Sequence, residues 1–243
     1  MSLEAKCRAL LQVGRIYTCF VTSPYFEPAR QALHDHLFGL PLNREQVLYR
    51  YEHCLRVAHI GRVVAEREGM DPDILELACL LHDIGKFDAT VPVDHGRAGA
   101  ILARPILEEL GLEETRITEI CQGIAMHTDG KWNYDPESPD FPGHDLFDHA
   151  PSLLARSVGD CDNVDRYSLL RIHGTMNWVR FSEKTATEAL IWIDEYQTIL
   201  AREREYLCST QSAQELWTRS LDDHEKYFTR LAEQLRPGVS RSR

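Results

Sequence analysis

Six histidine and aspartate side chains in this sequence have the types and spacing needed to bind metal ions. Each lies on, or at the end of, the inward-facing stripe of a segment with helical periodicity. Mixed imidazole and carboxylate ligands suit transition metals better than calcium or magnesium. We therefore predict two divalent metal ions. Iron and manganese are the first choices, and zinc, cobalt and nickel are the alternatives. The six ligand candidates are His53, His82, Asp83, His95, His127 and Asp162.

The segment 71–85 is the most apolar of the five segments that carry these residues. It opens with an Asp-Pro pair and closes with a glycine, which are typical start and stop signals of a helix. Residues 74–81 leave almost no polar face, so we expect a buried helix. This helix would carry His82 and Asp83 into the interior, where a carboxylate is costly unless it is paired or binds a metal. Asp83 is therefore the residue that we expect to lie between the two ions.

The other ligand candidates belong to four further segments with helical periodicity. His53 lies on the apolar stripe of the helix expected over Asn43–Gly69, whereas His59 lies on its polar side and is predicted to be solvated. The remaining three segments are 88–111 with His95, 113–128 with His127 at its end, and 151–173 with Asp162 and Asp165 on one apolar stripe and Asp160 on a neighbouring one.

The pattern as a whole is that of an all-α protein with one hydrophobic core. No segment shows the alternation of a strand, and we find no internal repeat. Further helices are expected at 28–39, 183–207 and 213–235. We expect a single domain over 1–243, with a core at about 43–173, N-terminal helices within 1–42 and a C-terminal helical extension over 174–243.

Composition narrows the range of partners. The 243 residues carry a formal net charge of −11, which disfavours nucleic acid polymers and anionic membranes but allows a small anionic ligand. The seven cysteines form no CxxC pair and are expected to be reduced thiols. No signal peptide or stretch of about 20 apolar residues is present, so we expect a cytoplasmic protein, for which a homodimer is an option.

The segment 129–150 interrupts the helical pattern with prolines, glycines and aspartates. A long loop inside a compact domain often serves a function. Trp132, Tyr134 and Phe141 are candidates to close over a ligand, and an ordinary surface excursion with packed aromatic residues is the alternative. His144 and His149 also lie here and are weaker candidates for a direct role.

The ordered set of histidines and aspartates resembles the HD superfamily of metal-dependent phosphohydrolases. The resemblance covers about residues 47–172. HGRAGAIL and HTDG are similar to the five-helix binuclear branch, which includes HD-GYP cyclic-dinucleotide phosphodiesterases and bacterial HD hydrolases of diadenosine tetraphosphate. The GYP motif is absent, and Thr128 stands where the HD-GYP pattern has a second histidine. The matching segments are YEHCLRVA (His53), LLHDIGK (His82, Asp83), HGRAGAIL (His95), GIAMHTDG (His127) and GDCDNVDR (Asp162).

This resemblance implies an HD-domain helical bundle that cleaves a phosphate ester or anhydride, most simply in a nucleotide or another small phosphorylated metabolite. Asp83 would bridge the metals and orient the attacking water, and Lys86 would hold a phosphate oxygen. Arg50, Lys131 and Arg166 are further candidates for binding the substrate. Asp165 is a candidate to hold a ligand histidine through its second nitrogen.

Two other functions use the same ligand set. Some HD-fold proteins, such as the inositol and phosphonate oxygenases, activate dioxygen at a di-iron site. A non-catalytic metal-containing sensor is the third reading, and it predicts no turnover of any phosphate ester. Lys86, three residues after Asp83 of the His82–Asp83 pair (the HD pair), favours the phosphohydrolase.

Overall fold

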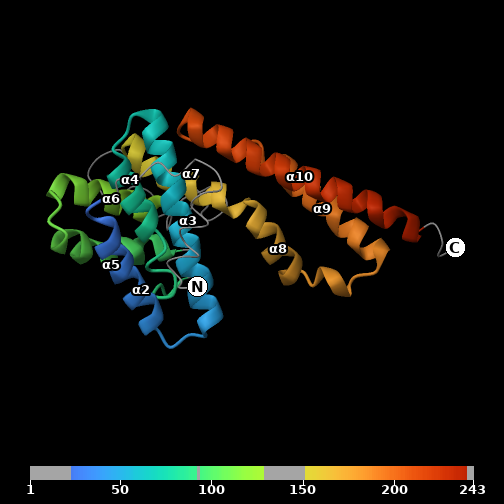
Figure 1. Cartoon of the computed structure of the whole chain (residues 1–243), viewed down its shortest axis with the longest axis horizontal. Coiled ribbons are helices and arrows are strands. Elements are labelled where there is room, and N and C mark those ends of the chain that lie inside the picture. The colour runs from blue at the N-terminus through green and yellow to red at the C-terminus, as the bar shows by residue number, and fades with distance from the viewer. Residues whose placement is uncertain (1–22, 92–93, 129–150, 240–243) are drawn as a thin grey trace, which may run out of the picture.

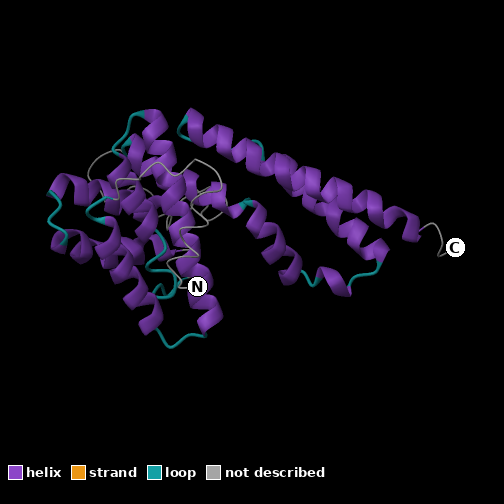
Figure 2. Cartoon of the chain, in the orientation of Figure 1, coloured by secondary structure: helices purple, strands orange, loops and turns teal. Residues whose placement is uncertain are grey.

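The computed structural model describes residues 23–91, 94–128 and 151–239, and these residues are folded into helices without a strand (Figure 2). The all-α prediction is confirmed. Within the described parts, no helix is long and apolar enough to cross a membrane. The predictions for 1–22, for Lys131 and for the aromatic residues and histidines of 129–150 lie outside the described residues. The helices are α2 (Phe26–Gly39), α3 (Arg44–Glu68), α4 (Pro72–Leu81), α5 (His95–Glu109), α6 (Glu114–Met126), α7 (Leu153–Arg166), α8 (Leu169–Trp178), α9 (Ala186–Glu203) and α10 (Gln211–Val239), with a short 3-10 turn, η2, at Phe181–Glu183.

Short-range signals set the ends of α3 and the start of α4 as predicted. The Asn43 side chain accepts a 2.9 Å hydrogen bond from the backbone N–H of Gln46 at the start of α3. Gly69 ends that helix with φ of 69°, a conformation that glycine adopts without steric cost. Asp71 accepts from the backbone of Asp73 and Ile74 and so caps α4.

The end of α4 differs from the prediction. The helix stops at Leu81 rather than at Gly85, and residues 82–88 continue as tight turns. His82 Nδ1 donates to the Cys79 carbonyl oxygen at 2.6 Å, which fixes the ring at this point. Gly85 does not have positive φ; instead, a methyl group there would collide with the backbone of Gly99 in α5. Gly85 therefore allows α5 to approach the turn that carries the HD pair.

The main core surrounds α4, which packs against α3, α6 and α7. Leu75, Leu77, Leu80 and Leu81 are almost completely buried, as the apolar pattern predicted. Full burial of one such side chain contributes roughly 1.5–3 kcal/mol of hydrophobic free energy. The ends of α4 and its neighbours are thereby held rigidly around the HD pair.

The C-terminal helices extend away from this bundle. In Figure 1, α9 and α10 run side by side as a long pair that leaves the bundle next to α7. The single helix expected over 151–173 is instead divided into α7 and α8, because the backbone of Ser168 is extended (ψ 157°) and its carbonyl accepts from His224 of α10. Ile172, Ile193 and Phe228 form a separate small core between α8, α9 and α10.

Candidate metal centre

The six predicted ligands meet at one place, although they come from five segments of the chain. His53 projects from the middle of α3, His95 is the first residue of α5, and Asp162 lies in α7. The other three follow helix ends: His82 and Asp83 after α4, and His127 after α6. All except His82 line a cavity of about 360 Å³.

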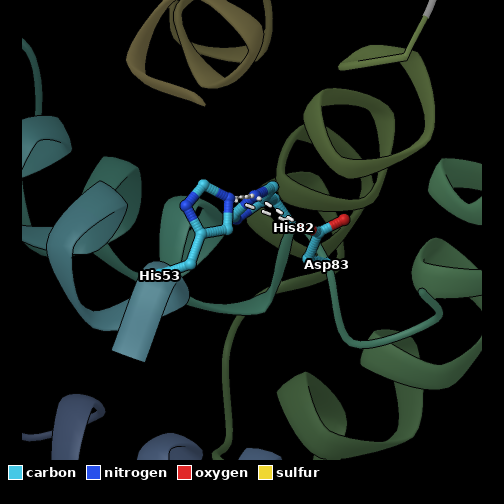
Figure 3. A group of neighbouring side chains, drawn as sticks. All are labelled: His53, His82 and Asp83. Atoms are coloured by element: carbon cyan, nitrogen blue, oxygen red, sulfur yellow. Dashed lines mark hydrogen bonds and ion pairs between the residues drawn. The ribbon is translucent and has the colours of Figure 1, made fainter. Parts of the chain in front are cut away.

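One ligand set surrounds Oδ2 of Asp83 (Figure 3). His53 Nε2 lies 3.2 Å from His82 Nε2, 3.6 Å from Asp83 Oδ2 and 3.0 Å from Asp162 Oδ1. His82 Nε2 lies 3.5 Å from Asp83 Oδ2 and 3.7 Å from Asp162 Oδ1. Ligand atoms that each lie about 2.1 Å from one ion are roughly 3.0–3.5 Å apart, so His53, His82 and Asp83 can hold one ion. Asp162 lies close enough to the two histidines to join them.

A second set surrounds the other oxygen of the same carboxylate. Asp83 Oδ1 lies 2.9 Å from His95 Nε2 and 3.6 Å from His127 Nε2, and the two imidazole nitrogens are 3.2 Å apart. Asp83 thus presents one oxygen to each set of ligands. With this arrangement, Asp83 could contribute one oxygen to each of two ions.

Hydrogen bonds on the outer side of three rings fix their orientation. His82 Nδ1 donates to the Cys79 carbonyl and His127 Nδ1 to the Ile124 carbonyl, each at 2.6 Å. His53 Nδ1 donates to Asp165 Oδ2 at 2.7 Å. In the neutral rings, each Nε2 therefore carries a lone pair that points to the centre, as metal-bound histidines require.

The centre fits a cation better than it fits an empty core. The Nε2 atoms of His53 and His82, 3.2 Å apart, are both acceptors in these tautomers. Asp83 Oδ1 is buried and accepts no hydrogen bond of ordinary geometry among the described residues, although His95 Nε2 lies 2.9 Å away. A transition metal in each ligand set would satisfy both features, because nitrogen and carboxylate donors are what such ions prefer.

The electrostatics of the centre favour ionised carboxylates and attract positive charge: the neighbouring aspartates outweigh the effect of burial and raise the pKa of His53 and of His82. Burial alone would raise the pKa of Asp83, but the neighbouring His82 and Arg50 hold it well below its usual range. The pKa of Asp162 is also held well below its usual range, because the neighbouring His53 and His82 outweigh the effect of burial. Burial lowers the pKa of His127, which keeps its imidazole neutral. Ionised carboxylates and neutral imidazoles are the forms that bind metal.

Two further aspartates of α7 have different surroundings. Asp165, predicted as a candidate partner of a ligand histidine, contacts His53 and also accepts two hydrogen bonds from Arg56, at 2.8 and 3.0 Å. Asp160, which the sequence left open, lies away from the ligands and accepts from the Tyr206 hydroxyl at 2.6 Å and the Ser209 N–H at 2.7 Å. His59 is exposed, as predicted.

The predicted cationic residues also reach the cavity. An Arg50 guanidinium nitrogen contacts Asp83 Oδ2, and Lys86 Nζ lies 3.3 Å from His95 Nε2. Burial lowers the pKa of Lys86. Lys86 lies in the turn that follows α4. Arg166 lines the cavity as well.

Several cavity residues were not found by sequence reasoning. Tyr49 lies four residues before His53 on α3, so the helical phase alone could have placed it. Glu203 and Tyr206 come from the end of α9, far along the chain, and carry no local signal. Among the described residues, the unpredicted ones that line the cavity are Tyr49, Thr128, Asn163, Arg171, Glu203 and Tyr206.

Comparisons with known proteins agree with this geometry. Residues 50–167 match the family model of the HD domain. A deoxyguanosinetriphosphate triphosphohydrolase-like protein of Bifidobacterium longum is 38% identical over 85 residues, which are 34% of this chain and 17% of that relative. Ribonuclease Y of Thermus thermophilus is 35% identical over 79 residues, which are 32% of this chain and 12% of that relative. The matched region thus spans less than a fifth of either relative's length.

The fold has a counterpart among solved structures. A predicted HD superfamily hydrolase from an uncultured Thermotogales bacterium aligns with a TM-score of 0.57 and 16% identity. The alignment covers 87% of this chain and 93% of that chain, so it includes helices outside residues 50–167. The helical fold and the family match agree, and the gathered histidines and aspartates all lie within residues 50–167, the part of the chain for which the HD-domain match is shown.

Proposed function

We propose that this protein hydrolyses a phosphate ester or anhydride of a small phosphorylated metabolite, most simply a nucleotide. The observation that carries the proposal is the position of Asp83. Its two oxygens face two ligand sets on the floor of a cavity that also receives Arg50 and Lys86. Two adjacent cation sites beside basic side chains suit a phosphoryl group.

Divalent metals in these sites would lower the pKa of bound water and polarise a phosphoryl oxygen. The protein's own side chains position the metal ligands and the phosphate of the substrate. Asp83 holds the two ligand sets at a fixed separation, and Asp165 orients the ring of His53. Lys86 and Arg50 provide positive charge for the non-bridging oxygens of the phosphate, whose negative charge both side chains can bind.

Arg50 would change partner when substrate binds. Its guanidinium now contacts Asp83, and its buried Nε has no hydrogen-bond partner in the described residues. A phosphate oxygen beside the metals would offer Arg50 another anionic acceptor. Nucleotides are the first substrates to test, because one relative is named for the hydrolysis of deoxyguanosine triphosphate.

The test is a substrate panel with protein reconstituted with Mn²⁺ or, without oxygen, with Fe²⁺. Nucleoside mono-, di- and triphosphates and an aryl phosphate are followed by release of phosphate or pyrophosphate. We expect turnover by the wild-type protein and by His59→Ala, and loss of turnover in Asp83→Ala. Oxygen-dependent spectral changes of the iron form without release of phosphate would instead support an oxygenase. Ligand binding without turnover of any phosphate compound would support a sensor.

A further inference from the structure

The cavity above the metal centre has an outer part built by residues beyond the ligand set. Arg166 ends α7, Arg171 lies in α8, and Tyr206 follows α9. Tyr49 of α3 lies beside Arg171, whose guanidinium carbon is 5.2 Å from the centre of the tyrosine ring. This outer part is therefore assembled largely by the C-terminal helices.

Arg166 and Arg171 have no carboxylate partner in the part of the chain that the structure describes. Each guanidinium group lies near an aromatic ring: Arg166 is 6.0 Å from the ring centre of Tyr167, and Arg171 lies beside Tyr49. Several arginines elsewhere are paired with carboxylates, as Arg62 is with Asp73 and Glu76. Burial lowers the pKa of Arg171, so its charge has a desolvation cost that no direct ion pair offsets among the described residues.

The outer part is held in place before any ligand binds. Asp160 accepts hydrogen bonds from the Tyr206 hydroxyl and the Ser209 backbone, which fixes the segment after α9 against α7. The carbonyl of Glu203 accepts from the Trp217 ring nitrogen at 3.3 Å. A preformed site loses little conformational entropy on binding.

The inner and outer cations lie near one another. The charge of Arg166 acts on Lys86, so the two parts of the cavity are electrostatically linked. Glu203 supplies the carboxylate of the outer part, against the two guanidinium groups. The balance there favours an anion, and planar guanidinium groups match phosphate oxygens in geometry.

We propose that Arg166 and Arg171 form a second anion subsite, which binds a phosphate adjoining the one that lies at the metal centre. The preferred substrates would then carry a di- or triphosphate chain rather than a single phosphate. This inference rests on the proposed function, because the metal centre is taken to hold the phosphate that is cleaved. A cavity of about 360 Å³ is of the size found for small-molecule sites.

Binding is the direct test, because it does not depend on turnover. Calorimetric titration of the Mn²⁺-loaded protein with orthophosphate and with tripolyphosphate gives two dissociation constants for each variant. We expect wild-type protein to bind tripolyphosphate more tightly, and Arg166→Gln and Arg171→Gln each to weaken tripolyphosphate binding about tenfold. Orthophosphate binding should change less than threefold, since that ion sits at the inner site.

A matched control removes the same charge elsewhere. The double variant Arg219→Gln/Arg230→Gln alters two exposed arginines of α10 that do not line the cavity. It should leave the preference for tripolyphosphate intact, whereas Arg166→Gln/Arg171→Gln should abolish it. Tripolyphosphate also chelates free Mn²⁺, so all variants are compared at one metal concentration.

Different results would contradict the second anion subsite and the proposed hydrolase activity. Equal weakening of orthophosphate and tripolyphosphate binding, or no effect of either cavity arginine, would overturn the second subsite even if the protein hydrolyses phosphate compounds. An arginine-dependent preference for tripolyphosphate in a protein without turnover would support the subsite and overturn the proposed hydrolase activity.

Discussion

Asp165 fixes the orientation of the His53 ring through the ring nitrogen that faces away from the candidate metal centre. The carboxylate accepts a 2.7 Å hydrogen bond from Nδ1 of the histidine, and two further bonds from Arg56 fix the carboxylate itself. His53 Nε2 consequently points at Asp83 and Asp162. The position of a predicted ligand on α3 is thus set by a residue of α7 that does not belong to the predicted ligand set.

Replacing Asp165 should weaken metal binding without removing a ligand. For Asp165→Asn we expect metal affinity to fall about 10–100-fold, because outer partners orient the ring and raise its basicity. Metal titration of chelator-treated protein measures the change, and excess metal should restore occupancy. Asp160→Asn is the control, since Asp160 is a buried carboxylate of the same helix that contacts Tyr206 instead. Equal affinities in the Asp165 and Asp160 variants would contradict this role.

The two ligand sets should be separable by mutation. His95→Ala removes a ligand of the set around Asp83 Oδ1 and leaves the other set unchanged. We expect the metal content of this variant to fall from two ions per chain to one, as measured by mass spectrometry of the metal. His59→Ala, on the exposed face of α3, should retain both. Loss of all metal from the His95 variant would argue for a single ion shared by all the ligands.

Lys86 should contribute to substrate binding rather than to metal binding. It lies 3.3 Å from His95 Nε2 at the edge of the cavity, and its ammonium group can bind a phosphate oxygen as a point charge. For Lys86→Ala we expect KM for a phosphate substrate to rise about tenfold, with metal content unchanged. Steady-state kinetics together with metal analysis check both statements. Unchanged kinetics would remove Lys86 from the site.

The C-terminal helices should lose stability in mild acid through His224. This buried ring donates from Nε2 to the Ser168 carbonyl, while Nδ1 accepts from the Tyr196 hydroxyl, and burial lowers its pKa. The unfolded chain therefore binds more protons, so the free energy of unfolding decreases as pH falls below about 6.5, the ordinary pKa of histidine.

Thermal unfolding of metal-free protein at pH 7.5 and 5.5 measures this effect. The decrease in Tm over this interval should be larger in the wild-type protein than in His224→Gln, which cannot take up the proton. Groups that titrate elsewhere are common to both proteins and cancel in the comparison. Identical decreases would show that His224 is not kept neutral by the fold.

Sequence alone located the helices best where the controlling residues are neighbours. The Asn43 and Asp71 caps and the glycine after α3 act within one turn, so local patterns reveal them. The early end of α4 could not be predicted in this way. It depends on the bond from the His82 ring to the Cys79 carbonyl and on the approach of α5 at Gly85.

The same distinction explains which site residues were predictable. Each ligand lies on the inward stripe or at the end of its own helix, so periodicity and the family pattern identify it. The outer cavity depends on how α9 and α10 pack beside α7. Glu203 and Tyr206 reach the cavity only through that packing, and the break between α7 and α8 that positions Arg171 is fixed by a contact of Ser168 with a distant histidine.

The most direct test concerns Asp83 as the bridge between two ions. Metal content per chain is measured for wild-type protein and for Asp83→Ala after equal exposure to Mn²⁺ or Fe²⁺, with circular dichroism to verify that both are folded. Two ions in the wild-type protein and a loss from both sites in the folded variant are the expected result. A folded Asp83→Ala protein with the full metal content would contradict a centre built on this carboxylate.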